Sequence, residues 1–258
     1  MKKISLRKII FSILIFSISL INFWFLSSCA SNKQAGPKTA EEYFKEGMEL
    51  FNKEDYLEAE HTFDLIKLQY PASQYADDAQ FYLAESNYKR KEFYMAAYNY
   101  ATLRRIYPRS EFVKKALFNA ALCYNELSPP FDRDQDYTLK AIKAFSEFQN
   151  AYPGDSLYTE ATNFITELRN KLAHRDYFTA GLYRKLYSLS SAVIYYDNVI
   201  NDYPDTKFYE PAFAGKIEVL IELKKIDEAK SVIENYKKLF PNGANIDKIK
   251  SFDFSNSK

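Results

Sequence analysis

The sequence has few of the residues from which catalytic and metal sites are built. Its 258 residues include two histidines and two cysteines, too few for a typical zinc site or for a nucleophile paired with a base. It also has no glycine-rich phosphate loop, no G-x-S-x-G motif and no H-E-x-x-H motif. We therefore expect no catalytic residues, no metal and no cofactor, and we predict that the protein is not an enzyme.

The chain also has few glycines and no strong excess of either charge. Six glycines stand against 22 tyrosines and 21 phenylalanines, a balance that favours helices over strands and tight turns. The formal net charge of the whole chain is +1. Residues 1–28 contain four basic residues and no acidic ones, so residues 29–258 have a net charge of −3. Because both signs are mixed along residues 29–258, we expect no nucleic-acid partner.

Residues 1–28 have the parts of a secretory signal peptide. A short basic start, residues 1–8, is followed by a mostly apolar run, residues 9–25, and then by small residues. The alternative is a transmembrane helix, but an apolar run of about 17 residues that contains Asn22 and several serines is marginal for crossing a bilayer.

The residues at the end of this segment favour a signal peptide over a transmembrane helix. The residues Leu26-Ser27-Ser28-Cys29 resemble the bacterial lipobox, in which the signal is cut just before a cysteine whose nucleophilic thiol takes a lipid. The resemblance implies a covalent diacylglycerol and an N-acyl lipid (palmitate) on Cys29. Residues 29–39 are small and polar, which predicts a flexible lipid-anchored tether. Position two after the cysteine is Ser31, with no aspartate near it, and the resemblance to lipoproteins then implies sorting to the outer membrane if the host has one.

The rest of the chain repeats. Five aromatic–proline steps punctuate it, with spacings of 37, 45, 51 and 37 residues: Tyr70-Pro71, Tyr107-Pro108, Tyr152-Pro153, Tyr203-Pro204 and Phe240-Pro241. An alanine lies twelve residues before each proline, and large apolar residues lie eight and five residues before it. A small residue followed by large ones at +4 and +7 forms one helical stripe, and each proline ends its helix.

This pattern predicts an all-α, TPR-like α-solenoid of five helix-turn-helix repeats. The expected repeats are residues 40–73, 74–109, 110–154, 155–205 and 206–241, followed by a polar C-terminal tail, residues 242–258. The longer spacings predict a loop within repeat three, at residues 127–137, and one long helix in repeat four, at about residues 157–187.

The first helix of each repeat should line the concave side of the solenoid, where peptides bind. Helical spacing places the following candidates on that side: Phe44, Met48, Phe51, Phe81, Glu85 and Tyr88. The alternative is that the aromatic residues among them belong to the core, since an aromatic stripe at helical spacing more often packs than binds. Cys123 lies in an apolar helical run and is expected to be an inert core residue.

The chain resembles the BamD family (YfiO/ComL) of lipoproteins in three places. The first is Ala40-Glu41-Glu42-Tyr43-Phe44, which opens a helix directly after the tether. The second is Arg133-Asp134-Gln135 in the loop that follows Leu122-Cys123-Tyr124, and the third is residues 168–173 of the long helix. The resemblance covers nearly all of the mature chain.

The resemblance implies a scaffold of the outer-membrane β-barrel assembly (BAM) complex, anchored by lipid to the outer membrane on its periplasmic face. Its implied partners are the POTRA domain of a BamA-like β-barrel subunit and unfolded outer-membrane proteins that await insertion into the membrane. Precursors would bind the N-terminal groove, and the BamA-like subunit would bind repeats three to five, including Arg133, Asp134 and Gln135. The alternative is a generic periplasmic TPR lipoprotein that scaffolds cell-envelope or division complexes.

Overall fold

The computed structural model describes residues 37–252. Contacts between residues divide the chain into two units, residues 1–39 and 40–258, so the description below concerns the second unit. The predicted signal peptide and Cys29 lie outside the described residues. Within residues 37–252, no helix is long and apolar enough to span a bilayer.

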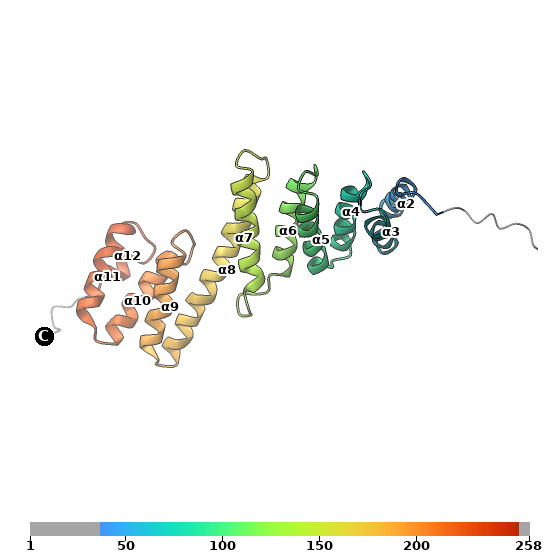
Figure 1. Cartoon of the computed structure of the whole chain (residues 1–258). Coiled ribbons are helices and arrows are strands. Elements are labelled where there is room, and N and C mark those ends of the chain that lie inside the picture. The colour runs from blue at the N-terminus through green and yellow to red at the C-terminus, as the bar shows by residue number, and fades with distance from the viewer. Residues whose placement is uncertain (1–36, 253–258) are drawn as a thin grey trace, which may run out of the picture. The chain divides into compact units, whose positions relative to one another are not determined.

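The described part of the chain consists of helices joined by short turns (Figure 1). The helices are α2 (Ala40–Asn52), α3 (Tyr56–Gln69), α4 (Ala76–Lys89), α5 (Phe93–Ile106), α6 (Val113–Leu127), α7 (Asp136–Ala151), α8 (Tyr158–Lys185), α9 (Leu189–Asp202), α10 (Tyr209–Glu222), α11 (Ile226–Leu239) and α12 (Ile246–Lys250). From α2 to α11, each helix packs against the next one in sequence. The prediction of an all-helical, TPR-like solenoid of five helix pairs is confirmed.

The alanine stripe forms the contact between paired helices. The alanines twelve residues before the prolines are fully buried: Ala59, Ala96, Ala141, Ala192 and Ala229, each 0% exposed. The large residues that lie eight and five residues before each proline are at most 5% exposed. A methyl side chain allows two helix backbones to approach closely, and the large side chains then fill the space beside it.

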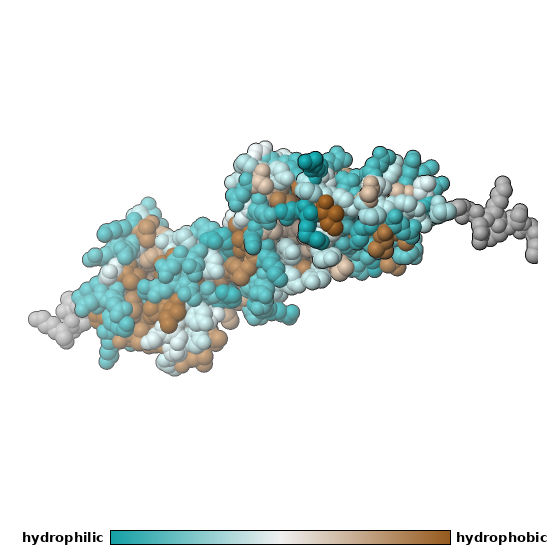
Figure 2. All heavy atoms as spheres, viewed as in Figure 1, coloured by the Kyte–Doolittle hydropathy of each residue, from teal (hydrophilic) through white to brown (hydrophobic). Residues whose placement is uncertain are grey.

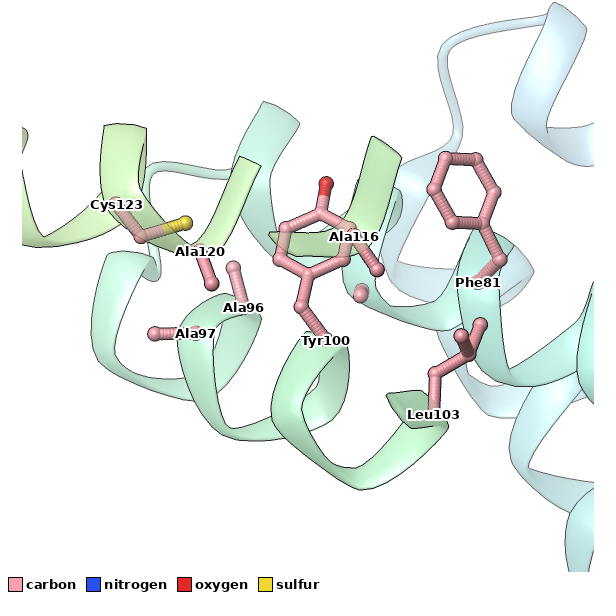
Figure 3. Close-up of a cluster of buried hydrophobic side chains, with 9 residues drawn as sticks. Phe81, Ala96, Ala97, Tyr100, Leu103, Ala116, Ala120 and Cys123 are labelled. Carbon is pink, nitrogen blue, oxygen red and sulfur yellow. The ribbon is translucent and has the colours of Figure 1, made fainter. Parts of the chain in front are cut away.

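One buried cluster joins repeats two and three. Figure 3 shows Tyr100 and Leu103 of α5 with Ala116 and Ala120 of α6 and Phe81 of α4. Cys123 belongs to the same cluster and is 0% exposed. Burial, reinforced by nearby carboxylates, raises the pKa of its thiol to about 12, so the thiol stays protonated at neutral pH and Cys123 is the inert core residue that was expected.

The turn between paired helices needs one residue in the left-handed conformation. In repeats one, two, four and five this residue has a φ of 56° to 63°: Glu54, Lys91, Tyr187 and Lys224. Each of them lies seventeen residues before the proline of its repeat. Repeat three instead has the loop 128–135 between α6 and α7, as the sequence predicts.

Helix α8 connects two stretches of core. It is 28 residues long, as the spacing of the prolines predicts. Its N-terminal part contributes Ala161 and Leu168 to a cluster with α6 and α7, and its C-terminal part contributes Ala173 and Ala180 to a cluster with α9 and α10. Figure 1 shows α8 running from the first group of helices to the second. Repeats three and four are therefore joined through one continuous helix.

Candidate functional site

An aromatic surface covers the first two repeats. It consists of Phe44, Met48 and Phe51 on α2, together with Tyr82 on α4, and we call it the N-terminal aromatic surface. All four side chains are half-buried and pack against the core of repeats one and two. The two alternatives left open by the sequence therefore apply together, because these side chains support the core and still present part of their surface to solvent.

Tyr82 is the centre of this surface, and the sequence analysis missed it. Its ring centroid lies 5.5 Å from that of Phe51, 6.1 Å from that of Phe44 and 5.8 Å from that of Phe63. Helical spacing pointed to Phe81 and Glu85 on the same helix, and Tyr82 lies beside them in sequence. Comparison of the repeats could not have found it, because the corresponding residue of repeat one is the exposed Lys45, 37 residues earlier.

Phe81, in contrast, is not accessible. It is 1% exposed, its ring stacks on Phe112 at a centroid distance of 4.3 Å, and the Nζ atom of Lys115 lies 4.9 Å from the ring centroid. The expectation that Phe81 lines a groove therefore needs correction. Phe112, just before α6, covers the ring, so Phe81 supports the surface from below.

Glu85 and Tyr88 take different positions. The Oε1 atom of Glu85 accepts hydrogen bonds from the Tyr100 hydroxyl and from Nδ2 of Asn119, both at 2.6 Å. Glu85 thus joins α4, α5 and α6, and burial together with this carboxylate raises the pKa of Tyr100. Tyr88 is half-buried and packs edge-on against Phe93 at 5.5 Å.

Acidic side chains flank the N-terminal aromatic surface. Burial and then the carboxylates of Asp78, Glu85 and Glu111 raise the pKa of Tyr82. The pKa of Asp78 is itself raised, first by burial and then by Asp77 and Glu111. Carboxylates so close to Tyr82 disfavour ligands that are dense in carboxylates.

A second candidate surface lies where the loop of repeat three meets α8. A cleft of about 650 Å³ there has the following lining: Pro130, Phe131, Glu167, Asn170, Lys171, His174, Lys207 and Phe208. The His174 ring lies 3.9 Å from the Phe131 ring and 5.0 Å from the Phe208 ring, measured between centroids. We call it the loop cleft. It brings together residues from repeats three, four and five.

Lysine side chains give the loop cleft a basic character. Lys171 donates a hydrogen bond to Ser128 in the loop at 2.8 Å, and burial lowers the pKa of Lys171. The Nζ atom of Lys207 lies 5.4 Å from the Phe208 ring centroid. Glu167 is the one acidic residue of the lining. An apolar segment that carries a carboxylate matches this combination of rings and cations.

The three residues predicted for the interface with a partner have separate roles. Arg133 and Asp134 are exposed in the loop, and Asp134 Oδ1 accepts a hydrogen bond from the Asp136 N–H at 3.0 Å, at the start of α7. Gln135 is only 3% exposed. Its Nε2 donates to the carbonyls of Pro130 and Arg133 at 2.8 and 2.9 Å, so the expectation that it contacts a partner needs correction, because this side chain shapes the loop from inside.

Neither surface resembles a catalytic centre. Among residues 37–252, no group of three or more His, Cys, Asp or Glu side chains is placed to hold a metal ion. His61 and His174 belong to different repeats, and His174 is held between aromatic rings.

The comparisons with known proteins agree with this description. The family described as "YfiO: Outer membrane lipoprotein" matches residues 37–234. A putative outer membrane protein assembly factor BamD from Aquifex aeolicus is 25% identical over 225 residues, which are 85% of this chain and 73% of the relative. The outer membrane protein assembly factor BamD of Neisseria gonorrhoeae is 23% identical, over 79% of this chain and 81% of the relative. The outer membrane protein assembly factor BamD of Rickettsia prowazekii is 22% identical, over 84% of this chain and 87% of the relative.

Solved structures of tetratricopeptide proteins are similar at a lower level. The TPR2AB-domain:pHSP90 complex of yeast Sti1 has a TM-score of 0.39 and 13% identity, and the match covers 82% of this chain and 95% of that one. A tetratricopeptide repeat protein from Parabacteroides merdae has a TM-score of 0.38 and 14% identity, with 76% and 78% covered.

Proposed function

The chain belongs to the YfiO family of outer membrane lipoproteins, and from this premise we propose that it is a lipid-anchored scaffold of the BAM complex. In this role it binds a BamA-like subunit and unfolded outer-membrane proteins, which are then inserted into the outer membrane. The observation that carries the proposal is the family match, which extends over residues 37–234. The curated relatives are named as assembly factors, and none of these names describes an enzyme.

The proposal includes attachment through Cys29. A diacylglycerol and an N-acyl chain on this residue would hold the solenoid at the periplasmic face of the outer membrane. Two acyl signals or more are needed for stable anchoring. The lipobox resemblance of residues 26–29 and the family description as an outer membrane lipoprotein support this step.

We assign precursor binding to the N-terminal aromatic surface, with Glu85 and Tyr88 beside it. Transmembrane β-strands alternate apolar and polar residues and carry aromatic girdles. The partly exposed rings of Phe44, Phe51 and Tyr82 offer contacts for such side chains. The acidic groups around Tyr82 disfavour acidic segments, so apolar and basic strands should bind best.

We assign the BamA-like subunit to the loop cleft, together with the exposed Arg133 and Asp134. The loop is a suitable docking element because Gln135 fixes it internally and Phe131 fixes it against α8. A loop that is ordered before binding loses less conformational entropy on complex formation. The two surfaces lie on different repeats, so one chain can hold a precursor and the barrel subunit at the same time.

The test is a pull-down with the purified POTRA domains of the BamA-like subunit from the same organism. The variant R133E/F131S should bind POTRA more than about ten-fold more weakly, since hot-spot contacts at an interface centre carry 2 kcal/mol or more. The matched control is Leu139→Ser, because Leu139 is 53% exposed on α7, just after the loop. If R133E/F131S binds POTRA as well as the control does, the interface has been misplaced.

A further inference from the structure

The turn that ends α8 carries large apolar side chains in solvent. Leu182, Leu186 and Tyr187 are 47%, 66% and 89% exposed, and we call these three residues the apolar tip. The Leu186 and Tyr187 N–H groups donate hydrogen bonds to the carbonyls of Leu182 and Arg184, both at 3.0 Å. The tip is therefore an ordered turn that displays its side chains outward.

The equivalent turns of the other repeats show that the fold does not require these residues. At the two positions of Leu186 and Tyr187, repeat one has Lys53 and Glu54, repeat two has Arg90 and Lys91, and repeat five has Leu223 and Lys224. The leucine therefore recurs in repeat five, where it packs partly against the core, whereas the tyrosine is found in repeat four alone among these turns. All of these turns place their second residue in the left-handed region, which bulky side chains adopt reluctantly. A tyrosine in this conformation, with its ring almost wholly in solvent, contributes nothing to the core. Since the conformation is common to all four turns, it is the exposure of so large a side chain, 89% at Tyr187, that points to a function.

Basic residues surround the apolar tip. Lys185 lies directly before Leu186 in the sequence. The turn between α10 and α11, which carries Lys224 and Lys225, lies beside the tip, because Arg184 of α8 pairs with two residues of α10, Glu218 at 2.5 Å and Glu222. Figure 1 shows both turns at the same edge of the solenoid. Within the described part of the chain, Lys185 and Lys224 have no ion pair, whereas Lys225 pairs with Glu228 at 2.8 Å.

The charged groups around the tip leave a surplus of one positive charge, with five basic residues (Arg184, Lys185, Lys224, Lys225 and Lys248) against four acidic ones (Glu218, Glu222, Asp227 and Glu228). Asp227, in the first turn of α11, is an exposed carboxylate close in sequence to these lysines, and the nearby Glu222 is already paired with Arg184. An open cleft of about 830 Å³ lies next to the tip, and its lining includes Arg184, Lys185, Tyr187 and the Glu222 carboxylate that pairs with Arg184. On the face shown in Figure 2, hydrophobic residues form several separate patches within a mostly hydrophilic surface.

We propose that the apolar tip docks on an anionic phospholipid surface. Leucine and tyrosine side chains that project from a turn suit the membrane interface, where apolar groups enter the headgroup region and the tyrosine hydroxyl stays hydrated. Lys185 and Lys224 lie where they can attract lipid phosphates, and lysines near an anionic leaflet strengthen binding. The open cleft beside Tyr187 has room for a headgroup. The tip gives the solenoid a second contact with the bilayer, far along the chain from residue 29.

This inference rests on the proposed function only in assuming that a bilayer is near, and its test does not need the lipid anchor. The test uses residues 37–258, which include every buried residue of the described chain and the compact unit 40–258. Circular dichroism is recorded first, and this fragment should give the spectrum of a helical protein. It is then sedimented with vesicles of phosphatidylcholine alone, or with vesicles in which about a third of the lipid is phosphatidylglycerol.

The fragment should bind the anionic vesicles, and L186S/Y187S should lower its partition coefficient about ten-fold. The matched control is L68S/Y94S, which removes one leucine and one tyrosine of similar exposure, 68% and 63%, from α3 and α5. This control should bind as the native fragment does. The charge variant K185E/K224E should lose its preference for anionic over neutral vesicles.

Three results would overturn the proposal. These are failure of the native fragment to sediment with anionic vesicles, binding of L186S/Y187S to them as tight as that of the control, and equal binding of the native fragment to neutral and anionic vesicles. A tip variant that loses POTRA binding while vesicle binding stays unchanged would assign the tip to a protein partner instead. The POTRA pull-down of R133E/F131S tests the proposed function separately, so the two can fail independently.

Discussion

Replacing Gly47 by alanine should destabilise the protein, whereas the same change at Gly181 should stabilise it. Both glycines lie inside helices, α2 and α8, and neither has a positive φ. On helix propensity alone, alanine at either position gains about 0.5–1 kcal/mol. A Cβ atom on Gly181 meets nothing within 4 Å, so this gain is expected in full.

At Gly47 the new methyl group has no room. Its Cβ would lie 2.6 Å from Cε1 of Phe63 and 2.9 Å from two further atoms of the same ring. Phe63 is 0% exposed and packs against Phe44 and Tyr82, so the ring cannot swing into solvent. Overpacking of this kind costs about 1–3 kcal/mol, which exceeds the gain in helix propensity.

The assay is thermal unfolding of residues 37–258, followed by circular dichroism. The two variants should differ by about 2 kcal/mol, which for a domain of this size corresponds to a difference in Tm on the order of 5 °C. Because Phe44 and Tyr82 must shift with Phe63, G47A should also weaken precursor binding. If G47A melts at or above the native temperature, the close packing of α2 on α3 described here is wrong.

Three further perturbations have defined outcomes. Cys29→Ala should abolish incorporation of labelled palmitate in cells, and retained label would contradict the lipobox interpretation. Gln135→Ala removes the hydrogen bonds that hold the loop of repeat three, which should destabilise the loop by about 1–3 kcal/mol. Amide exchange in that loop should therefore accelerate and POTRA binding should weaken, and unchanged exchange would refute this role. Burial raises the pKa of Glu210, but hydrogen bonds from Tyr236 and Asn245 outweigh it and lower the pKa below its ordinary value of 4.5. The resulting stability is present above pH 4.5 and is lost as the pH falls below it, so amides of α12 should lose protection in that range, and a pH-independent exchange rate would contradict this.

The repeat architecture was predictable because it depends on local rules. Prolines end helices, alanines permit close approach and large residues fill the gaps, and all three act within one helix or between neighbours. Position alone therefore located the buried stripe, from Ala59 in repeat one to Ala229 in repeat five. The same rules accounted for the loop of repeat three and for the length of α8.

Exposure at the candidate sites was less predictable, because it depends on the segments that cover each helix. Phe81 has the spacing of a groove residue, yet Phe112 from the following connection stacks on it. Gln135 looks like a polar loop residue, yet its amide is turned inward to satisfy backbone carbonyls. Tyr187 lies at a turn position whose conformation is set by the backbone, so its exposure follows only from the arrangement of the surrounding helices.

The central claim is that this helical solenoid is the part of a β-barrel assembly complex that joins the barrel subunit to its precursors. The most direct measurement is identification of the membrane proteins that co-purify with the native, full-length chain in mild detergent. The account predicts a BamA-like subunit with POTRA domains as a stoichiometric partner. Recovery of cell-wall or division factors, with no BamA-like subunit among them, would contradict it.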